Sequence, residues 1–131
     1  INEDDEVALT VRGGTSNTRK GQWELPGGTV EHGDSLEITV CKEIEEELGL
    51  IVKPQYCFDI CEDMVEGQHW ISFGYFATVI GGELKNMEPE KFDDVRYFPL
   101  SCLPDNTANL SIQVLSLYNQ RNKINISRVS E

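Results

Sequence analysis

The segment Lys42–Gly49 (KEIEEELG) is unusually acidic, with four carboxylates within five residues. The glycine that follows them is typical of the residue after a helix C-terminus. That end of a helix carries partial negative charge, so acidic side chains are unfavourable there. Residues three and four apart share a helix face, which places Glu43, Glu46 and Glu47 within an arc of about 100°, whereas Glu45 points elsewhere.

Two interpretations account for this crowding. A solvated charged surface is the usual meaning of an acidic run, although such surfaces tend to alternate in sign and here only Lys42 is positive. The other interpretation is a bound divalent cation. Mg²⁺ prefers hard oxygen ligands, keeps several waters and recruits substrate phosphates. Three carboxylates on one helix face suit that role, and a cation would reverse their mutual repulsion.

The composition excludes several classes of protein. The chain has 131 residues, 39% of them hydrophobic, which is enough for one domain with a real core. A net charge of −12 opposes binding to nucleic acid and to anionic membranes, because both are bound through excess Lys and Arg. No apolar run approaches the roughly 20 residues that span a bilayer. A small phosphorylated substrate fits if metal ions bridge it to the protein.

The cysteines point to a reducing compartment. There are four, Cys41, Cys57, Cys61 and Cys102, without a paired CxxC pattern, and there are only two histidines. A zinc site is therefore not expected. Scattered cysteines in a chain large enough to form a core favour free thiols and a cytoplasmic location over a disulfide framework.

The pattern of apolar and turn residues predicts seven elements in a single domain over 1–131. The expected strands are 6–12, 22–25, 51–61, 69–80 and 95–98. One expected helix is capped by Asp34 or Ser35 and runs to about Leu48, and the other is 110–118. Strands 51–61 and 69–80 form an antiparallel hairpin. Residues 121–131 are expected to be a loose tail, and Ile1 to be the last residue of a strand that this sequence lacks. The order β-β-α-β-β-β-α predicts an α/β layered domain with a mixed sheet.

The acidic segment also has a recognisable context. Gly28, Asp34 and the residues from Lys42 to Leu50 resemble the Nudix box, G-x5-E-x7-R-E-U-x-E-E-x-G-U, in which U is a bulky aliphatic residue. Seven of its nine specified positions match at the right spacing. The preceding segment 23–28 (WELPGG) is the usual entry to the box. Segments 85–91 and 97–104 look like those of a MutT-like subgroup of nucleoside triphosphate diphosphatases.

Two positions depart from the box. Asp34 stands where the box has Glu, and Lys42 stands where it has Arg. In the family these side chains support the loop and the helix rather than bind the metal. The substitutions keep the charges but shorten both arms and lose the bidentate fork of Arg, so we expect weaker support around a functional site.

The resemblance implies a Nudix-type α/β/α sandwich that binds Mg²⁺ or Mn²⁺. By analogy, Glu43, Glu46, Glu47 and the backbone carbonyl of Gly27 would be the metal ligands. Glu90 would be a loop ligand or the general base. Glu43 and Glu46 are the helix candidates for the catalytic base, because the base differs among family members.

The phosphates of a substrate would be met by cationic side chains and the glycine loop, and the candidates are Arg12, Arg19, Lys20 and Gly28. The implied reaction is hydrolysis of the pyrophosphate bond in a nucleoside diphosphate linked to another group. A (deoxy)nucleoside triphosphate, giving the monophosphate and pyrophosphate, is the preferred substrate, and a nucleotide sugar or dinucleotide is an alternative. The rival functions are a catalytically inactive nucleotide sensor on the same fold and a purely structural acidic helix. The subgroup also suggests a homodimer.

Overall fold

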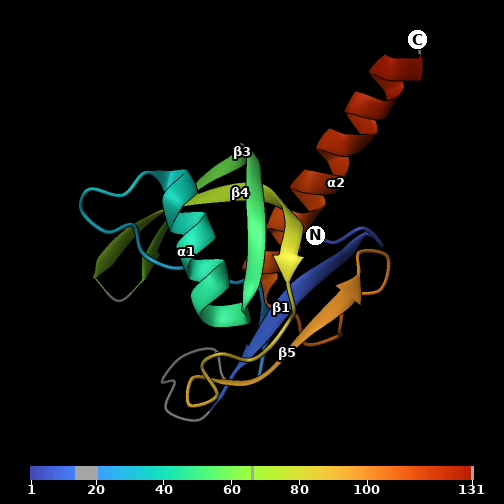
Figure 1. Ribbon diagram of the computed structural model, residues 1–131. Coiled ribbons are helices and arrows are strands. Elements are labelled where there is room, and N and C mark those ends of the chain that lie inside the picture. The colour runs from blue at the N-terminus through green and yellow to red at the C-terminus, as the bar shows by residue number, and fades with distance from the viewer. Residues whose placement is uncertain (14–20, 66, 131) are drawn as a thin grey trace.

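The computed structural model describes residues 1–13, 21–65 and 67–130 (Figure 1). Five strands and two helices follow one another along the chain. They are β1 (Glu6–Arg12), β2 (Trp23–Glu24), α1 (Leu36–Leu48), β3 (Leu50–Val65), β4 (Gln68–Gly82), β5 (Phe92–Pro99) and α2 (Asn109–Ser130). The predicted order of elements is confirmed.

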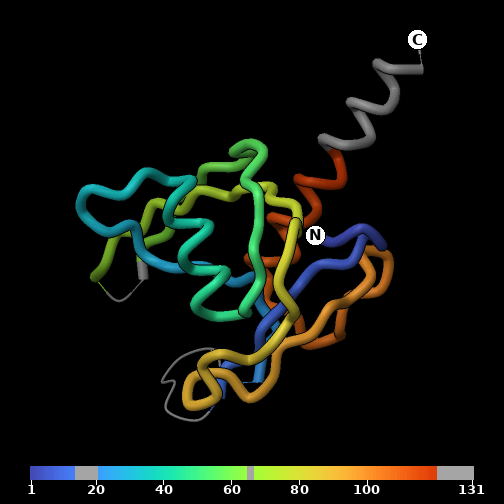
Figure 2. The backbone as a smooth tube through the Cα atoms, viewed as in Figure 1, coloured from blue at the N-terminus to red at the C-terminus, as the bar shows by residue number. Residues whose placement is uncertain are grey.

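The strands form two groups. β1 lies at the centre of a three-stranded antiparallel sheet in the order β2-β1-β5, and β3 and β4 form a long antiparallel hairpin. Parallel geometry occurs at the isolated bridge between Trp23 and Thr107. It also occurs where Ile1 binds β4, because its N–H donates to Ala77 O and its carbonyl accepts from Val79 N (Figure 2).

Strand β1 is buried on both faces, which makes it the middle of a layered structure. Ala8 belongs to a core shared with Leu48 at the end of α1 and with the start of β3. Val7 and Leu9 point the other way, into a second core that includes Leu115 of α2. Helices therefore cover the central strand from both sides, and the expected α/β sandwich is confirmed.

Helix α1 begins and ends where local sequence signals predict. The Ser35 side chain accepts a hydrogen bond from Ile38 N at 3.1 Å, which satisfies one of the free N–H groups of the first turn. Gly49 adopts the left-handed conformation, with φ 70°, and its N–H donates to Glu45 O. The apolar side chains of this helix, including Val40 and Ile44, pack on the core beside β3.

The C-terminal helix differs from the sequence prediction. A helix over 110–118 with a loose tail over 121–131 was expected, whereas α2 extends from Asn109 to Ser130. The physical reason is that no glycine or proline occurs within this range, so nothing in the sequence stops the helix.

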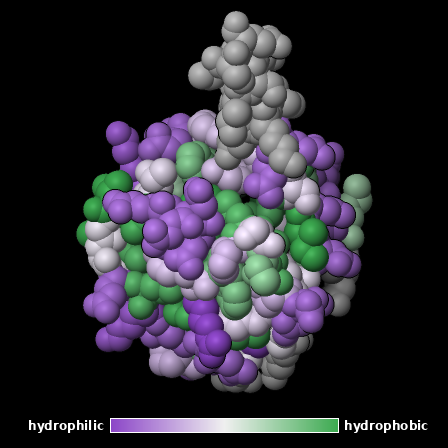
Figure 3. Space-filling model, turned by 90° about the vertical axis from the view of Figure 1, so that its right-hand side faces the viewer, coloured by the Kyte–Doolittle hydropathy of each residue, from purple (hydrophilic) through white to green (hydrophobic). Residues whose placement is uncertain are grey.

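The surface is polar over most of the face that carries α2. Hydrophilic side chains alternate with smaller apolar areas there (Figure 3). No helix in the described ranges combines enough length and hydropathy to cross a membrane. All four cysteines are free thiols.

Candidate functional site

Glu47, the penultimate residue of α1, is a carboxylate held inside the protein. Only 2% of the residue is exposed, and its Oε1 has no hydrogen-bond partner. Burial is the largest cause that raises the pKa of Glu47, to about 7 from its usual 4.5. Lys91 and a hydrogen bond from the Gly27 backbone N–H lower this pKa, whereas Glu43 and Glu88 raise it. A buried, half-satisfied carboxylate of this kind is costly unless a proton or a metal cation neutralises it.

Glu43 lies one helical turn before Glu47 and packs directly against the glycine loop. A Cβ atom added to Gly28 would lie 2.1 Å from Glu43 Cδ and 2.3 Å from its Oε2. A side chain at position 28 would therefore displace the Glu43 carboxylate. Burial raises the pKa of Glu43, and the neighbouring charge of Glu46 raises it further. Glu46 itself is exposed.

The segment between β4 and β5 folds over the C-terminal end of α1. The N–H groups of Lys85 and Met87 donate to the carbonyls of Leu48 and Glu47, at 2.9 and 3.1 Å. Carbonyls at the end of a helix lack partners within the helix, so these bonds satisfy them. Asn86 stabilises the turn that follows, because its Oδ1 accepts from Glu88 N and its Nδ2 donates to Phe92 O.

This turn brings Lys91 and Glu88 to the site. Lys91 Nζ lies 3.7 Å from Glu47 Oε2 and 3.7 Å from Glu88 Oε2. The sequence-predicted loop acid was Glu90, which is exposed. The acid whose charge raises the pKa of both Glu43 and Glu47 is Glu88. Sequence reasoning missed Lys91 and Glu88. Both residues lie in the segment 85–91, which also contains Glu90, and they are three positions apart.

Asp34 and Lys42, the two departures from the box, contact each other. Lys42 Nζ donates to Asp34 Oδ2 at 2.8 Å and lies 3.5 Å from Glu31 Oε2. The hydrogen bond to Asp34 is the main cause that raises the pKa of Lys42. The contact ties the loop before α1 to the middle of that helix, despite the shorter side chains.

Of the predicted phosphate-binding cations, the structure describes Arg12. Its Nε donates to Glu24 Oε1 at 2.5 Å, and Glu24 is buried. This charge-assisted bond joins β1 to β2 and stabilises the strand that leads into the glycine loop. Arg19 and Lys20 lie outside the described residues.

The start of α2 fixes the strand that precedes Gly27 and Gly28. Ser111 Oγ accepts a hydrogen bond from Leu25 N at 3.0 Å, and Ser111 is buried. Trp23 makes two backbone bonds to the same segment, from its N–H to Asn106 O and from Ala108 N to its carbonyl. Two distant parts of the chain therefore position the glycine loop against α1.

The donors at this site suit a divalent cation. They are oxygen atoms, which hard cations prefer, and one of them is a buried carboxylate oxygen without a hydrogen-bond partner. They lie beside Gly28, where a side chain would collide with the Glu43 carboxylate. Within the described ranges, no three His, Cys, Asp and Glu side chains already converge as a metal site. Mg²⁺ does not require such a cage, since it binds through one or two carboxylates, waters and substrate phosphates.

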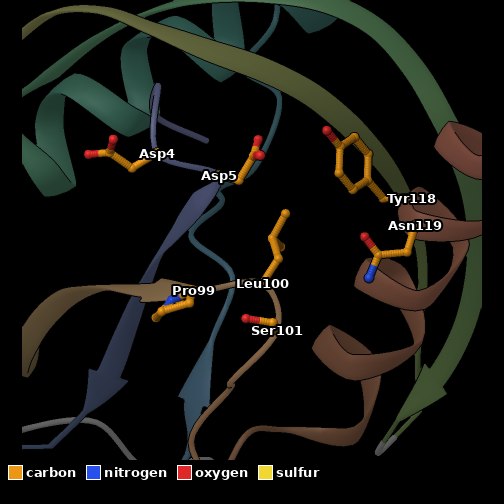
Figure 4. A pocket seen from close by; sticks show the side chains of 7 residues that line it. All are labelled: Asp4, Asp5, Pro99, Leu100, Ser101, Tyr118 and Asn119. Atoms are coloured by element: carbon orange, nitrogen blue, oxygen red, sulfur yellow. The ribbon is translucent and has the colours of Figure 1, made fainter. Parts of the chain in front are cut away.

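A pocket of about 380 Å³ lies elsewhere, between the turn at Asp4 and Asp5, the end of β5 and the side chain of Tyr118 (Figure 4). None of its lining residues belongs to α1 or to the glycine loop. The acidic site of α1 is therefore distinct from this pocket.

Comparisons with known proteins identify the family of this chain. The family model for the NUDIX domain matches residues 1–118. An ADP-ribose pyrophosphatase of Methanocaldococcus jannaschii is 38% identical over 106 residues, which cover 79% of this chain and 60% of the relative. The 8-oxo-dGDP phosphatase NUDT18 of Mus musculus is 31% identical, with 79% of this chain and 31% of the relative covered. The chain thus spans less than two thirds of the length of these curated relatives.

Solved structures show the same fold. The crystal structure of a MutT NUDIX hydrolase from Burkholderia pseudomallei superposes with a TM-score of 0.78 at 29% identity, covering 88% of this chain and 89% of that one. A MutT protein from Methanosarcina mazei, at 22% identity and a TM-score of 0.77, supports the fold alone. The family match and these similarities establish that this chain belongs to the Nudix family.

Proposed function

We propose that this chain is a divalent-metal-dependent hydrolase that cleaves the pyrophosphate bond of a nucleoside diphosphate linked to another group. The observation that carries the proposal is the buried Glu47 carboxylate, one oxygen of which is unpaired, beside Glu43, whose carboxylate lies against Gly28. A (deoxy)nucleoside triphosphate is the first candidate substrate. ADP-ribose is the second, because one relative is named as its pyrophosphatase.

The metal would be held by carboxylates of α1 and by the glycine loop. Glu43, Glu46, Glu47 and the carbonyl of Gly27 are the proposed ligands. Mg²⁺ or Mn²⁺ bound there supplies phosphate charge neutralisation and a water of lowered pKa. Glu47 is buried and bonded to the Gly27 N–H, so it would form the inner edge of the metal site, whereas Glu46 is exposed and would be the outer ligand.

The reaction needs a base next to the attacking water. The water oxygen forms a bond to phosphorus, the bridging oxygen leaves with its electron pair, and a carboxylate takes the proton. Glu43 and Glu46 are the candidate bases on α1. Glu90 remains a proposed loop ligand or base, although Glu88 is the acid whose charge acts on Glu43 and Glu47.

The test is product release from a panel of nucleotides with Mg²⁺, comparing the wild type with Glu46→Gln. We expect turnover of at least one panel member and a loss of several orders of magnitude in Glu46→Gln, with an unchanged circular dichroism spectrum. Glu45→Gln is the matched control, because Glu45 is also exposed but lies on a different helix face. Nucleotide binding without turnover of any panel member would favour the sensor instead.

A further inference from the structure

Lys91 lies between two carboxylates without being hydrogen-bonded to either. Its Nζ is 3.7 Å from Glu47 Oε2 and 3.7 Å from Glu88 Oε2. An N–H···O hydrogen bond needs about 2.7–3.2 Å, so the attraction acts through space. The side chain is 40% exposed, whereas that of Glu47 is 3% exposed. A partly solvated ammonium group therefore balances a buried negative charge.

The backbone of Lys91 is fixed although its side chain is long and flexible. Its N–H donates to Glu88 O at 2.9 Å, and its carbonyl accepts from Gly13 N at 3.2 Å. The ammonium lies 5.0 Å from the centre of the Phe92 ring. A four-carbon stem on a fixed Cα allows the charged group to move between the carboxylates and solvent.

Lys91 is also the cation that acts on both inner carboxylates. In the portion of the chain described by the structure, it is the basic side chain that lowers the pKa of Glu43 and of Glu47. Lys42, the basic residue of α1 itself, is hydrogen-bonded to Asp34. A divalent ion bound by Glu43 and Glu47 would bring two positive charges to the Glu47 carboxylate, which already lies 3.7 Å from the Lys91 ammonium. The metal ion and the ammonium group would therefore repel each other.

We propose that Lys91 is a built-in counter-cation of the Glu47 carboxylate, with which a divalent metal ion must compete. Lys91 is thus a positioning residue that lies against both Glu47 and Glu88 in the metal-free protein and sets the metal concentration at which the site is occupied. The Nudix box assigns no role to this position, which lies 41 residues after its last residue, Leu50. The inference depends on the proposed function for the existence of the metal site.

The test compares the wild type with Lys91→Met, which keeps most of the stem but removes the charge. Mg²⁺ binding is measured by calorimetry at pH 8.5, above the pKa of Glu47, so that a proton on this carboxylate does not compete. We expect Lys91→Met to bind Mg²⁺ roughly tenfold more tightly, because a repulsive charge is removed. In EDTA its thermal midpoint should fall by several degrees, since Glu47 loses its counter-charge, and Mg²⁺ should restore it.

Two variants control for trivial causes. Lys85→Met makes the same charge change in the same segment, but the Lys85 side chain is not part of the ion pairs at the site, so Mg²⁺ affinity and thermal midpoint should change little. Lys91→Arg keeps the charge and should behave as the wild type. Equal Mg²⁺ affinity and equal stability of Lys91→Met and the wild type would overturn the inference about Lys91 alone. Absence of Mg²⁺ binding by the wild type would overturn the proposed metal site itself.

Discussion

Gly28 and Glu43 are packed so closely that one added carbon on the glycine would lie 2.1 Å from the carboxylate carbon of the glutamate. Gly28→Ala should therefore displace the Glu43 side chain or the loop itself. Glu43 is a proposed metal ligand, and small displacements within a catalytic site are costly, so we expect hydrolysis to fall about 100-fold or more. Steady-state kinetics measure this, with thermal unfolding as the check that the protein still folds.

The neighbouring glycine provides the matched control. A Cβ atom on Gly27 would meet no atom within 4 Å, and alanine retains both the N–H and the carbonyl of that residue. Gly27→Ala should keep activity within a few-fold of the wild type. If both variants lost activity equally, general loop rigidity rather than the Gly28–Glu43 contact would be responsible.

The raised pKa of Glu47 makes the stability of the metal-free protein depend on pH. The native state holds the proton up to about pH 7, whereas the unfolded chain releases it near 4.5. The resulting stabilisation is complete below pH 4.5 and is lost as the pH rises through 7, and it amounts to on the order of 3 kcal/mol. Urea unfolding in EDTA at pH 5 and pH 8 measures the difference.

Glu47→Gln should remove this pH dependence, because its amide does not titrate. The variant should be more stable than the wild type at pH 8 and similar to it at pH 5. Glu45→Gln, on the exposed side of the same helix, should leave the wild-type pH profile unchanged. A profile that is the same in Glu47→Gln and the wild type would mean that Glu47 is already ionised at pH 5.

The 2.8 Å contact between Asp34 and Lys42 predicts coupled effects on activity. Each of Asp34→Asn and Lys42→Met should lower kcat less than tenfold, because neither residue is a proposed metal ligand. The double variant should lose no more than either single variant, since each change breaks the same contact. Additive losses in this cycle would show that the two residues act independently.

Ser111 should be required for the glycine loop although it lies on α2. Ser111→Ala leaves the N–H of Leu25 without its partner, which destabilises the protein by about 1–3 kcal/mol. Chemical denaturation measures the loss, and kcat should fall with it because Leu25 leads into Gly27. Ser116→Ala, at an exposed position of the same helix, should change neither quantity. An unchanged kcat in Ser111→Ala would show that the hydrogen bond between Leu25 and Ser111 does not affect the site.

Local signals explain which parts of the fold could be predicted. Ser35 and Gly49 set the ends of α1 through contacts within four residues, so the sequence shows them directly. The strand at 6–12 was predicted equally well from the alternation in its sequence. The predicted end of the last helix was wrong, because no glycine or proline follows residue 118 within α2, which continues to Ser130.

The site was predictable where it lies on one helix and not where it depends on distant contacts. The spacing of Glu43 and Glu47 follows from helix geometry, and the structure places both against the glycine loop. Lys91 reaches them because its segment is hydrogen-bonded to the end of α1, some 40 residues earlier in the chain. No periodicity in the sequence indicates such a bond.

The bond between Leu25 and Ser111 joins residues that are 86 positions apart. On the ribosome, every carboxylate of α1 is synthesised long before Ser111 emerges. A nascent chain can form that helix early, but the loop against which its acids pack is anchored only when the first turn of α2 arrives. Hydrolytic activity should therefore appear late in translation, after the first turn of α2 has bound the segment that precedes the glycine loop.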